Sequence, residues 1–184
     1  MLLLKNVRLS FPSLFKATSY QNEGEPKYSA VFLVEKGSEQ EKQIKAEIQR
    51  VATDAFGDQA KMIIERQNQT NRKLLRDGDG PEGFTSAGEQ KNGYAGHSFI
   101  KGQSKTAPKI VGRSRQPLTE DDGLPYAGCM VNVQLDIWAQ KNQYGKAVNC
   151  KLLAVQFWED GERLGGSSGA DIDAFETAEE DDWA

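Results

Sequence analysis

A stretch of 30 residues without a carboxylate, 90–119, holds the clearest candidates for binding chemistry in this sequence. Its basic residues are Lys91, Lys101, Lys105, Lys109, Arg113 and Arg115. Cations at this density, with no acidic residue between them, favour contact with a polyanion, although the same charges could simply keep a loop solvated. Tyr94 and Phe99 lie among them. Aromatic rings beside cations suit a single nucleic-acid strand, whose bases stack while its phosphates are neutralised.

Trp138 is a further candidate for contact with bases. In the segment 129–140 apolar and polar residues alternate, which places Trp138 on the polar side with Asn132, Gln134 and Asp136. A large aromatic side chain on a solvated strand face suits base stacking; the alternative is that a loop or the helix covers this face and buries the ring. Secondary candidates for phosphate contact are the basic residues Arg72, Lys73, Arg76, Lys141 and Lys146.

The last 15 residues, 170–184, form a strip of carboxylates without any basic residue. Its candidates for binding partner proteins are Asp171, Asp173, Phe175, Glu176, Glu179, Glu180, Asp181, Asp182 and Trp183. The whole chain has a net charge of −4, yet residues 1–169 alone carry +3. A strip of like charges buries little surface and is a poor folding element, but tethering gives it an effective concentration of order mM near the basic body. We therefore expect a disordered tail that competes with a nucleic acid for the basic surface.

The sequence offers little for catalysis. It contains neither a serine in a nucleophile elbow nor a phosphate-binding loop that ends in Lys-Ser or Lys-Thr. Two acidic clusters, RDGDG (76–80) and TEDD (119–122), could hold a divalent metal for a nuclease that uses Asp77 and Asp122. Both clusters lie among glycine and proline residues, where aspartate is common in turns. We therefore expect no enzyme activity, no cofactor and no metal.

The cysteines, the histidine and the first residues of the sequence also give no sign of a disulfide, a zinc site or a signal peptide. Cys129 and Cys150 lie in apolar segments and are expected to be reduced core thiols rather than a disulfide, and His97 makes no zinc pattern. The opening MLLLK is too short for the apolar region of a signal peptide. No run approaches the ~20 apolar residues of a membrane span. We therefore expect a cytoplasmic protein without a membrane contact.

Short strand-like segments dominate the pattern along the chain. They lie at 2–11, 27–36, 96–104, 108–112, 129–140 and 146–158. On alternation, the apolar side of the first segment is expected to hold Leu3, Val7, Leu9 and Phe11. The clearest helix follows Ser38, which has Glu41 in capping-box spacing, and ends at Gly57. A weaker helical pattern covers 58–69.

Too few helices alternate with these strands for a doubly wound α/β fold. We predict a mainly β (α+β) fold: a single five-stranded antiparallel barrel of the OB type with one main helix and long loops. The predicted nucleic-acid-binding domain covers residues 1–160, a flexible linker rich in glycine and serine covers 161–169, and the acidic tail covers 170–184.

A set of motifs occurs in a specific order along the body of the chain. The stretches are VRLSFPSLF (7–15), PKYSAVFLVEK (26–36), LLRDGDG (74–80), YAGHSFIKGQSK (94–105), PKIVG (108–112), YAGCMVNVQLDIWA (126–139), GKAVNCKLLAVQF (145–157) and DGERLGG (160–166). Together they resemble the phage-encoded single-stranded DNA-binding proteins, an OB-fold family. The resemblance covers nearly all of the predicted domain.

The resemblance implies sequence-tolerant binding of single-stranded DNA in phage DNA replication and recombination, in the host-cell cytoplasm and without catalysis. It also implies that the acidic tail competes with DNA and recruits replication proteins such as a polymerase, helicase or primase; association into homo-oligomers stays open. Here Trp183 is followed by Ala184, so the aromatic residue is not the last one. The other hypotheses are an acidic protein-interaction module or DNA-mimic regulator, in which the tail is the active part, and the metal-dependent nuclease.

Overall fold

The computed structural model describes residues 1–19 and 24–164. Its strands are β1 (Leu2–Thr18), β2 (Lys27–Glu35), β3 (Leu75–Asp77), β4 (His97–Ser104), β5 (Lys109–Val111), β6 (Met130–Asn142) and β7 (Gly145–Glu159). Its helices are α1 (Glu39–Phe56) and α2 (Ala60–Asn68), with short 3₁₀ turns η2 (Gly57–Gln59), η3 (Pro81–Gly83) and η4 (Glu120–Asp122). The strands and helices predicted from the sequence are all present, and β3 is an addition. Among the described helices, none combines the length and apolar character needed to cross a membrane.

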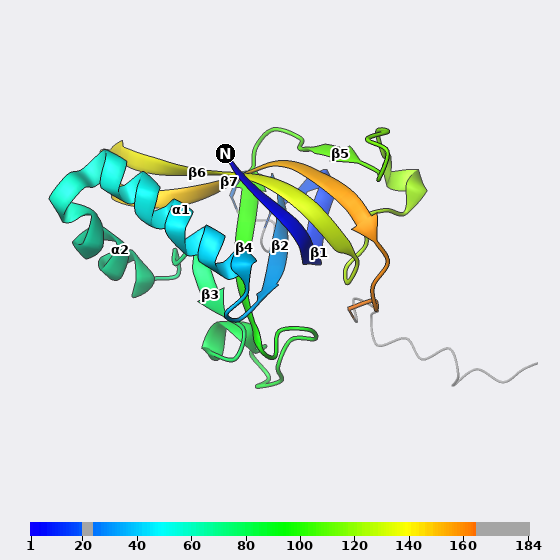
Figure 1. Cartoon of the computed structure of the whole chain (residues 1–184), viewed down its shortest axis with the longest axis horizontal. Helices are drawn as coiled ribbons and strands as arrows, with labels where there is room; N and C mark the ends of the chain where they lie inside the picture. Colours follow the sequence, from blue (N-terminus) through cyan, green and yellow to red (C-terminus); the bar gives the residue numbers. More distant parts are fainter. Residues whose placement is uncertain (20–23, 165–184) are drawn as a thin grey trace, which may run out of the picture.

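Strands of the single sheet close into a five-stranded barrel, as predicted (Figure 1). The sheet order is β3-β4-β2-β1-β6-β7-β5, and a further pairing of β4 with β7 closes the ring through β1, β2, β4, β6 and β7. Neighbours in the barrel are antiparallel except for this closing pair, which is parallel and joins Gln103 to Lys151. Closure therefore brings together strand segments that are far apart in the sequence.

β1 does not keep one alternation along its length, which corrects the prediction for its apolar side. Asn6 has a φ of 55°, and the pairing of β1 with β6 shifts between Leu4 and Val7. Because of this bulge, Leu4 and Val7 both face the core although they are three positions apart, an offset that regular alternation would place on opposite faces. Leu3 is exposed instead of buried, and a second irregularity further along β1 leaves Phe11 exposed as well.

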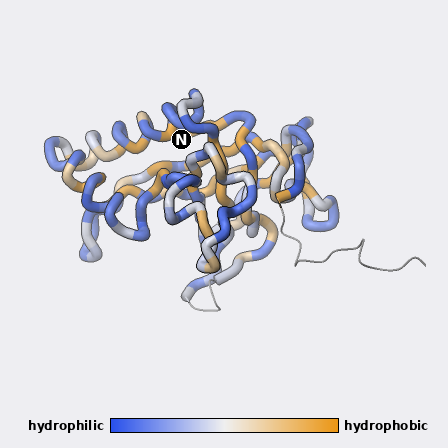
Figure 2. Tube along the Cα trace, turned by 90° about the horizontal axis from the view of Figure 1, so that it is seen from below, coloured by the Kyte–Doolittle hydropathy of each residue, from blue (hydrophilic) through white to orange (hydrophobic). Residues whose placement is uncertain are grey.

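The barrel interior and the inner face of α1 share one apolar core. Its fully buried side chains include Leu4, Leu9, Phe32, Ile44, Ile100, Leu135 and Leu152. Burial of one such side chain stabilises the fold by ~1.5–3 kcal/mol, and Figure 2 shows hydrophobic positions inside the fold and hydrophilic ones along loops and outer helix faces. Cys129 and Cys150 are buried free thiols, as predicted, and burial raises their pKa values to about 11 and about 12.

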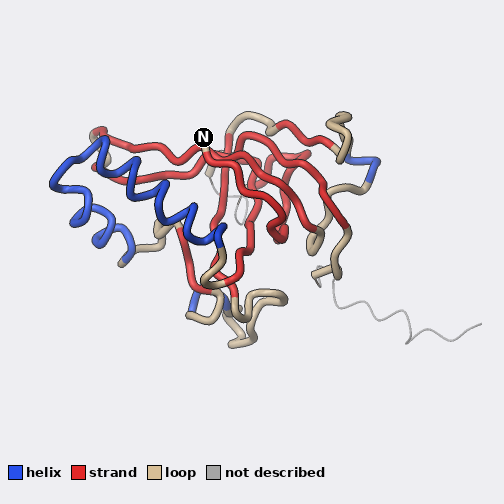
Figure 3. Tube along the Cα trace, in the orientation of Figure 1, coloured by secondary structure: helices blue, strands red, loops and turns tan. Residues whose placement is uncertain are grey.

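α1 begins where the sequence predicts, and its first turn is tied to β4. Ser38 Oγ accepts a hydrogen bond from the Glu41 amide (3.3 Å), while Glu41 Oε1 accepts one from the Gly37 amide (3.3 Å). The Glu41 carboxylate also accepts a bond from Ser98 Oγ at 2.5 Å, which lowers the pKa of Glu41. From this point α1 runs beside the barrel towards the far end of the β6–β7 hairpin (Figure 3).

α2 is attached to the barrel by a buried glutamine. Gln67 Nε2 donates to the carbonyl of Val148 (2.7 Å) and to that of Arg72 (2.8 Å), and the Val148 amide donates to Gln67 Oε1 (2.8 Å). The side-chain amide of Gln67 therefore pairs with β7 as a neighbouring strand would. The same bonds hold the loop that carries Arg72 beside β7.

The substitution Gln67→Leu is expected to lower the free energy of unfolding by about 1–3 kcal/mol for each backbone group that it leaves buried without a partner. The groups at risk are the amide and carbonyl of Val148, which is buried. Urea denaturation measures the loss. Gln43 on α1 is exposed, so Gln43→Leu is the matched control and should change stability by no more than about 0.5 kcal/mol. Equal stability of Gln67→Leu and the wild type would contradict this role of Gln67.

The chain after β7 stays bound to the barrel as far as Leu164. Arg8 Nη2 donates to the carbonyl of Glu162 (2.7 Å), and the Leu164 amide donates to the carbonyl of Ala127 (3.1 Å). Residues 161–164 therefore belong to the folded body, which corrects the prediction that the flexible linker begins at 161. The remainder of the predicted linker and the acidic tail lie outside the described residues.

Candidate nucleic-acid interface

A groove of about 840 Å³ lies between the β3–β4 edge and the β6–β7 hairpin. Its basic lining residues are Lys27, Arg72, Lys73, Arg76, Lys101, Lys105 and Lys151. Of the described residues that line it, Asp136 is the acidic one. The basic side chains come from β2, β3, β4 and β7, from the segment that leads into β3 and from the residue after β4. A concave surface with this excess of positive charge raises the local concentration of a polyanion.

Trp138 stands in this groove with 42% of its surface exposed. β6 alternates as its sequence predicts, with Val133, Leu135 and Ile137 buried on the opposite side. The neighbour of Trp138 across the hairpin is Asn149. Within the described part of the chain neither a loop nor a helix buries the ring, contrary to the alternative, and the indole is accessible to a base from the groove.

A hydrogen-bond network fixes an arginine beside Trp138. Arg72 Nη2 donates to Gln140 Oε1 (2.9 Å) and to Asn149 Oδ1 (3.0 Å), and Asn149 Nδ2 donates to Gln140 Oε1 (3.0 Å). Gln140 and Asn149 lie on the two strands of the hairpin that carries Trp138. Because these partners are neutral, the positive charge of the guanidinium is not offset and can attract an anion. Because the side chain is already held in place, less side-chain entropy is lost when that anion binds.

Lys101 lines the groove close to two other cations. Partial burial lowers the pKa of its ammonium group, and the nearby charges of Arg76 and Lys27 lower it further. Arg76 is itself oriented by bonds from its guanidinium to the carbonyls of Lys73 (2.9 Å) and Asn71. A phosphate in this position would offset the repulsion between the cations, so the groove favours an anionic ligand.

Two groove cations take part in ion pairs at the surface. Lys105 Nζ lies 2.9 Å from Glu25 and Lys73 Nζ lies 3.7 Å from Glu82. The Lys105–Glu25 pair is exposed and the Lys73–Glu82 pair half-exposed, and pairs in contact with solvent contribute only about 0–1 kcal/mol. A nucleic-acid phosphate can therefore replace either carboxylate at little energetic cost.

Tyr94 and Phe99 are not the stacking platforms that the sequence predicts. Phe99 shares the outer face of β4 with Lys101, as expected, but Tyr94 packs edge-on against its ring at 4.9 Å between centroids. Tyr94 is 1% exposed and Phe99 5%, in a small cluster with Val31 and Leu33. Alternation identified the right face of the strand, whereas the loop that covers part of this face could not be seen in a local pattern.

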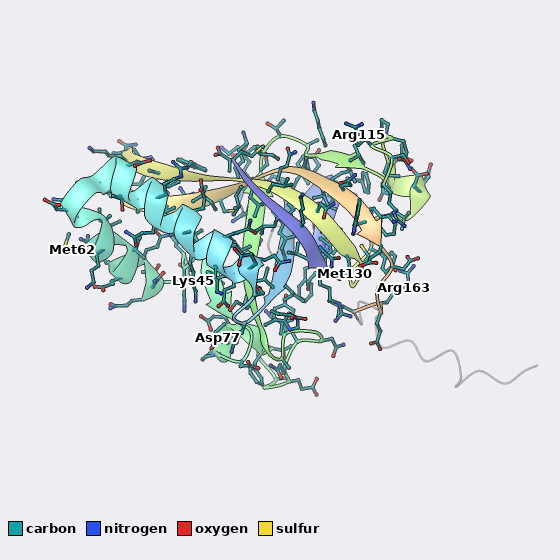
Figure 4. All side chains as sticks on the ribbon, in the orientation of Figure 1. Lys45, Met62, Asp77, Arg115, Met130 and Arg163 are labelled. Carbon is teal, nitrogen blue, oxygen red and sulfur yellow. The ribbon has the colours of Figure 1, made fainter. Side chains whose placement is uncertain are left out.

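Three of the predicted cations lie outside the groove lining, on and after β5. Lys109 pairs with β7 at Ala154, and the Arg113 guanidinium lies 5.3 Å from the ring centre of Trp158. Figure 4 shows Arg115 near β5, at the end of the molecule opposite the helices. The cations of the carboxylate-free stretch are thus divided: Lys101 and Lys105 line the groove, three lie on and after β5, and Lys91 lies beside Tyr94.

Lys141 and Lys146 face each other across the tip of the β6–β7 hairpin, outside the groove lining. Lys146 Nζ donates to Gln59 Oε1 at 2.8 Å, next to the start of α2.

Two basic residues of the groove were missed by the sequence prediction, Lys27 and Lys151. Strand alternation alone places Lys151 outward between the buried Cys150 and Leu152, but only the pairing of β4 with β7 shows that it joins the other cations.

The acidic residues proposed for a nuclease make structural contacts in separate places. Asp77 and Asp79 each lie 2.6 Å from Lys36 Nζ, and this lysine is the main cause that lowers the pKa of Asp79 to about 2. Asp122 accepts a hydrogen bond from the Thr119 amide at 2.6 Å and caps η4. Among the described residues, no group of three or more histidine, cysteine, aspartate or glutamate side chains is arranged to hold a metal.

Sequence comparison relates the chain to phage proteins over its whole length. Residues 1–184 match the model of a family described as Enterobacter phage Enc34, ssDNA-binding protein. A curated relative, "Putative protein p50" of Acyrthosiphon pisum secondary endosymbiont phage 1, is 37% identical over 176 residues, which covers 94% of this chain and 91% of the relative.

Solved structures show the same relationship. The single-stranded DNA-binding protein from bacteriophage Enc34 in complex with ssDNA superposes with a TM-score of 0.60 at 27% identity, over 89% of this chain and 88% of that one. The gp2.5 single-stranded DNA-binding protein encoded by bacteriophage T7 gives a TM-score of 0.52 at 12% identity, over 92% and 95% of the two chains. At that identity the T7 protein shows a likeness of fold alone.

Proposed function

The chain belongs to the family of the Enterobacter phage Enc34 single-stranded DNA-binding protein, and from this premise we propose that it binds single-stranded DNA in the basic groove around Trp138. The observation that carries the proposal is the groove, in which seven basic side chains surround one exposed indole. The Enc34 relative, 27% identical to this chain, was solved in complex with ssDNA. The motif order in the sequence predicted the same family.

The groove offers two kinds of contact that together tolerate any sequence. Cations such as Lys101 and Arg72 neutralise phosphates, which are the same at every nucleotide. Trp138 stacks on a base, and every base has a π-face. A single strand can expose phosphates and an unstacked base at once, whereas a duplex keeps its bases stacked inside. We therefore propose that single strands bind more tightly than duplexes of equal length.

Fluorescence anisotropy with labelled oligo(dT) tests this function. Binding should be tight at low salt and should weaken steeply as salt is added, because each phosphate contact releases counterions. A duplex of the same length serves as the competitor. Failure of oligo(dT) to bind at low salt, or equal affinity for the duplex, would contradict the proposed function.

We also propose that the acidic tail, 170–184, competes with DNA for the groove and recruits replication or recombination proteins in the host cell. Leu164 packs against the cluster of Tyr94 and Phe99, on the same barrel face as Lys101. The chain continues for 20 residues beyond it, a contour length of about 60–70 Å. That length allows the tail carboxylates to reach the groove from their point of attachment.

Deletion of residues 170–184 is expected to tighten the binding of oligo(dT) several-fold at low salt, and to leave it almost unchanged at high salt. The reason is that the tethered polyanion, at an effective concentration of order mM, no longer occupies the cations. Anisotropy titrations of the full chain and the truncated chain measure the difference. A variant with the tail carboxylates changed to amides keeps the length and should behave like the deletion. Equal affinity of full-length and truncated protein at low salt would refute the competition.

A further inference from the structure

Phe11 is the most unusual aromatic residue among the described ones, because it is exposed and its backbone is strained. Its side chain is 61% exposed, and its φ is 45°, in the left-handed region. A bulky residue in this region is destabilised by roughly 1–2 kcal/mol. Such strain persists only where the surrounding structure holds it, and it concentrates at functional sites.

The strain results from an irregularity in β1 that reorients the side chain. The pairing of β1 with β2 shifts between Ser10 and Ser13. Ser10 already faces outward, where its Oγ lies 3.1 Å from Tyr94 Oη. Regular alternation would turn Phe11 into the barrel; the bulge places it instead on the outer side, beside Tyr94.

Phe11 lies beside buried aromatic rings and close to a lysine. Its ring lies 6.4 Å from that of Tyr94, which in turn packs on Phe99 at 4.9 Å. Lys91 Nζ lies 5.8 Å from the ring centre of Phe11 and 5.6 Å from that of Tyr94. Lys91 is also anchored by a bond to the carbonyl of Glu82 (3.2 Å). An exposed ring on a rigid support with an adjacent ammonium group is the combination that binds a nucleotide in a single-strand groove.

Strand register places this pair next to the basic groove. Ser10 pairs with Val31 on β2, and Val31 pairs with Lys101 on β4. With neighbouring strands ~4.8 Å apart, the backbones of Ser10 and Lys101 are separated by about 10 Å. Phe11 thus lies two strands away from the groove residue Lys101, with β2 between them, on the same outer face of the barrel.

We propose that Phe11 and Lys91 form a second nucleotide-binding position, at which a base stacks on Phe11 and a phosphate contacts Lys91. The inference rests on the proposed function and extends it: the DNA strand leaves the groove at Lys101 and crosses β2 to reach Phe11. Trp138 and Phe11 then hold bases at two separated points of one bound strand. Only an oligonucleotide long enough to span both points gains from Phe11.

The test compares Phe11→Leu with Phe11→Tyr on two lengths of oligo(dT), about 4 and about 16 nucleotides, the limits of site size for an OB fold. Leucine keeps the apolar contact with Tyr94 but has no π-face, whereas tyrosine keeps the ring. Phe11→Leu should weaken binding of the longer strand by a factor of about 5 to 150, the equivalent of one stacked base. The shorter strand should bind with unchanged affinity, and Phe11→Tyr should resemble the wild type.

Met62, which is 50% exposed on α2, supplies a control variant, Met62→Leu, that should bind both lengths normally. Lys91→Gln should reduce the salt slope for the longer strand by ~0.7, the contribution of one phosphate contact. Wild-type affinity of Phe11→Leu for the longer strand would overturn the inference, and so would equal weakening at both lengths. If the wild-type chain itself binds neither oligonucleotide, the proposed function fails, and this inference with it.

Discussion

The variant Trp138→Ala is expected to bind single-stranded DNA more weakly than the wild type by a factor of about 5 to 150, which corresponds to the ~1–3 kcal/mol of one base stacked on an aromatic ring. Trp138 is 42% exposed in the groove, so its removal deletes little core packing and thermal stability should change little. The dependence of log affinity on log salt should keep its slope, because no phosphate contact is lost. Anisotropy titrations of oligo(dT) at several salt concentrations measure affinity and slope together.

Trp158 provides the matched control for this prediction. It lies on the same hairpin and is 38% exposed, but it stacks near Arg113 outside the groove lining. Trp158→Ala should leave the affinity for oligo(dT) close to that of the wild type. If Trp138→Ala unfolds the protein, the ring is part of the core; if both alanine variants bind equally well, stacking on Trp138 is not a source of affinity.

The triple variant of Lys27, Lys101 and Lys151 to glutamine should show the largest loss of affinity at low salt. These lysines line the groove on three different strands. Loss of three phosphate contacts should reduce the salt slope by about 2, at ~0.7 per contact on a single strand. If variant and wild type bind equally at about 1 M salt, this difference in slope makes the variant bind roughly two to three orders of magnitude more weakly at about 0.05 M salt.

A second triple variant tests whether the loss of affinity comes from contacts in the groove or from the change in the net charge of the protein. Lys5, Lys42 and Lys61 are exposed and lie outside the groove lining, so their change to glutamine alters net charge by the same amount. The control triple should keep the wild-type salt slope within about 0.5. Equal slopes for the two triple variants would show that DNA responds to the overall charge of the protein and not to the groove.

Local patterns in the sequence were sufficient for most of the fold. Strict alternation in β6 identified both its buried side and the outward position of Trp138, and the Ser38–Glu41 spacing located the start of α1. β1 could not be predicted in this way, because the bulge at Asn6 depends on the pairing with β6. One inserted residue reverses which side chains face the core, so the bulge at Asn6 put Leu3 on the wrong side, and the second irregularity, between Ser10 and Ser13, did the same for Phe11.

The site was harder to predict than the fold, because it depends on contacts between distant segments. Lys101 and Lys151 line the same groove only because β4 pairs with β7, and no local pattern carries that information. Judged from their strand and loop positions alone, Tyr94 and Phe99 would be exposed. In the structure they pack on each other, and Phe11 lies beside them. The carboxylate-free stretch indicated the right chemistry; tertiary structure decides which of its residues share one surface.

The central claim is that a DNA base stacks on Trp138, and a protein in which Trp138 is the sole tryptophan tests it most directly. The chain contains three tryptophans, so Trp158→Phe and Trp183→Phe leave its fluorescence to Trp138 alone. Titration with poly(dT) should quench this fluorescence strongly, and added salt should restore it as the phosphate contacts are lost. Unchanged fluorescence under conditions in which anisotropy shows the DNA to be bound would contradict the claim.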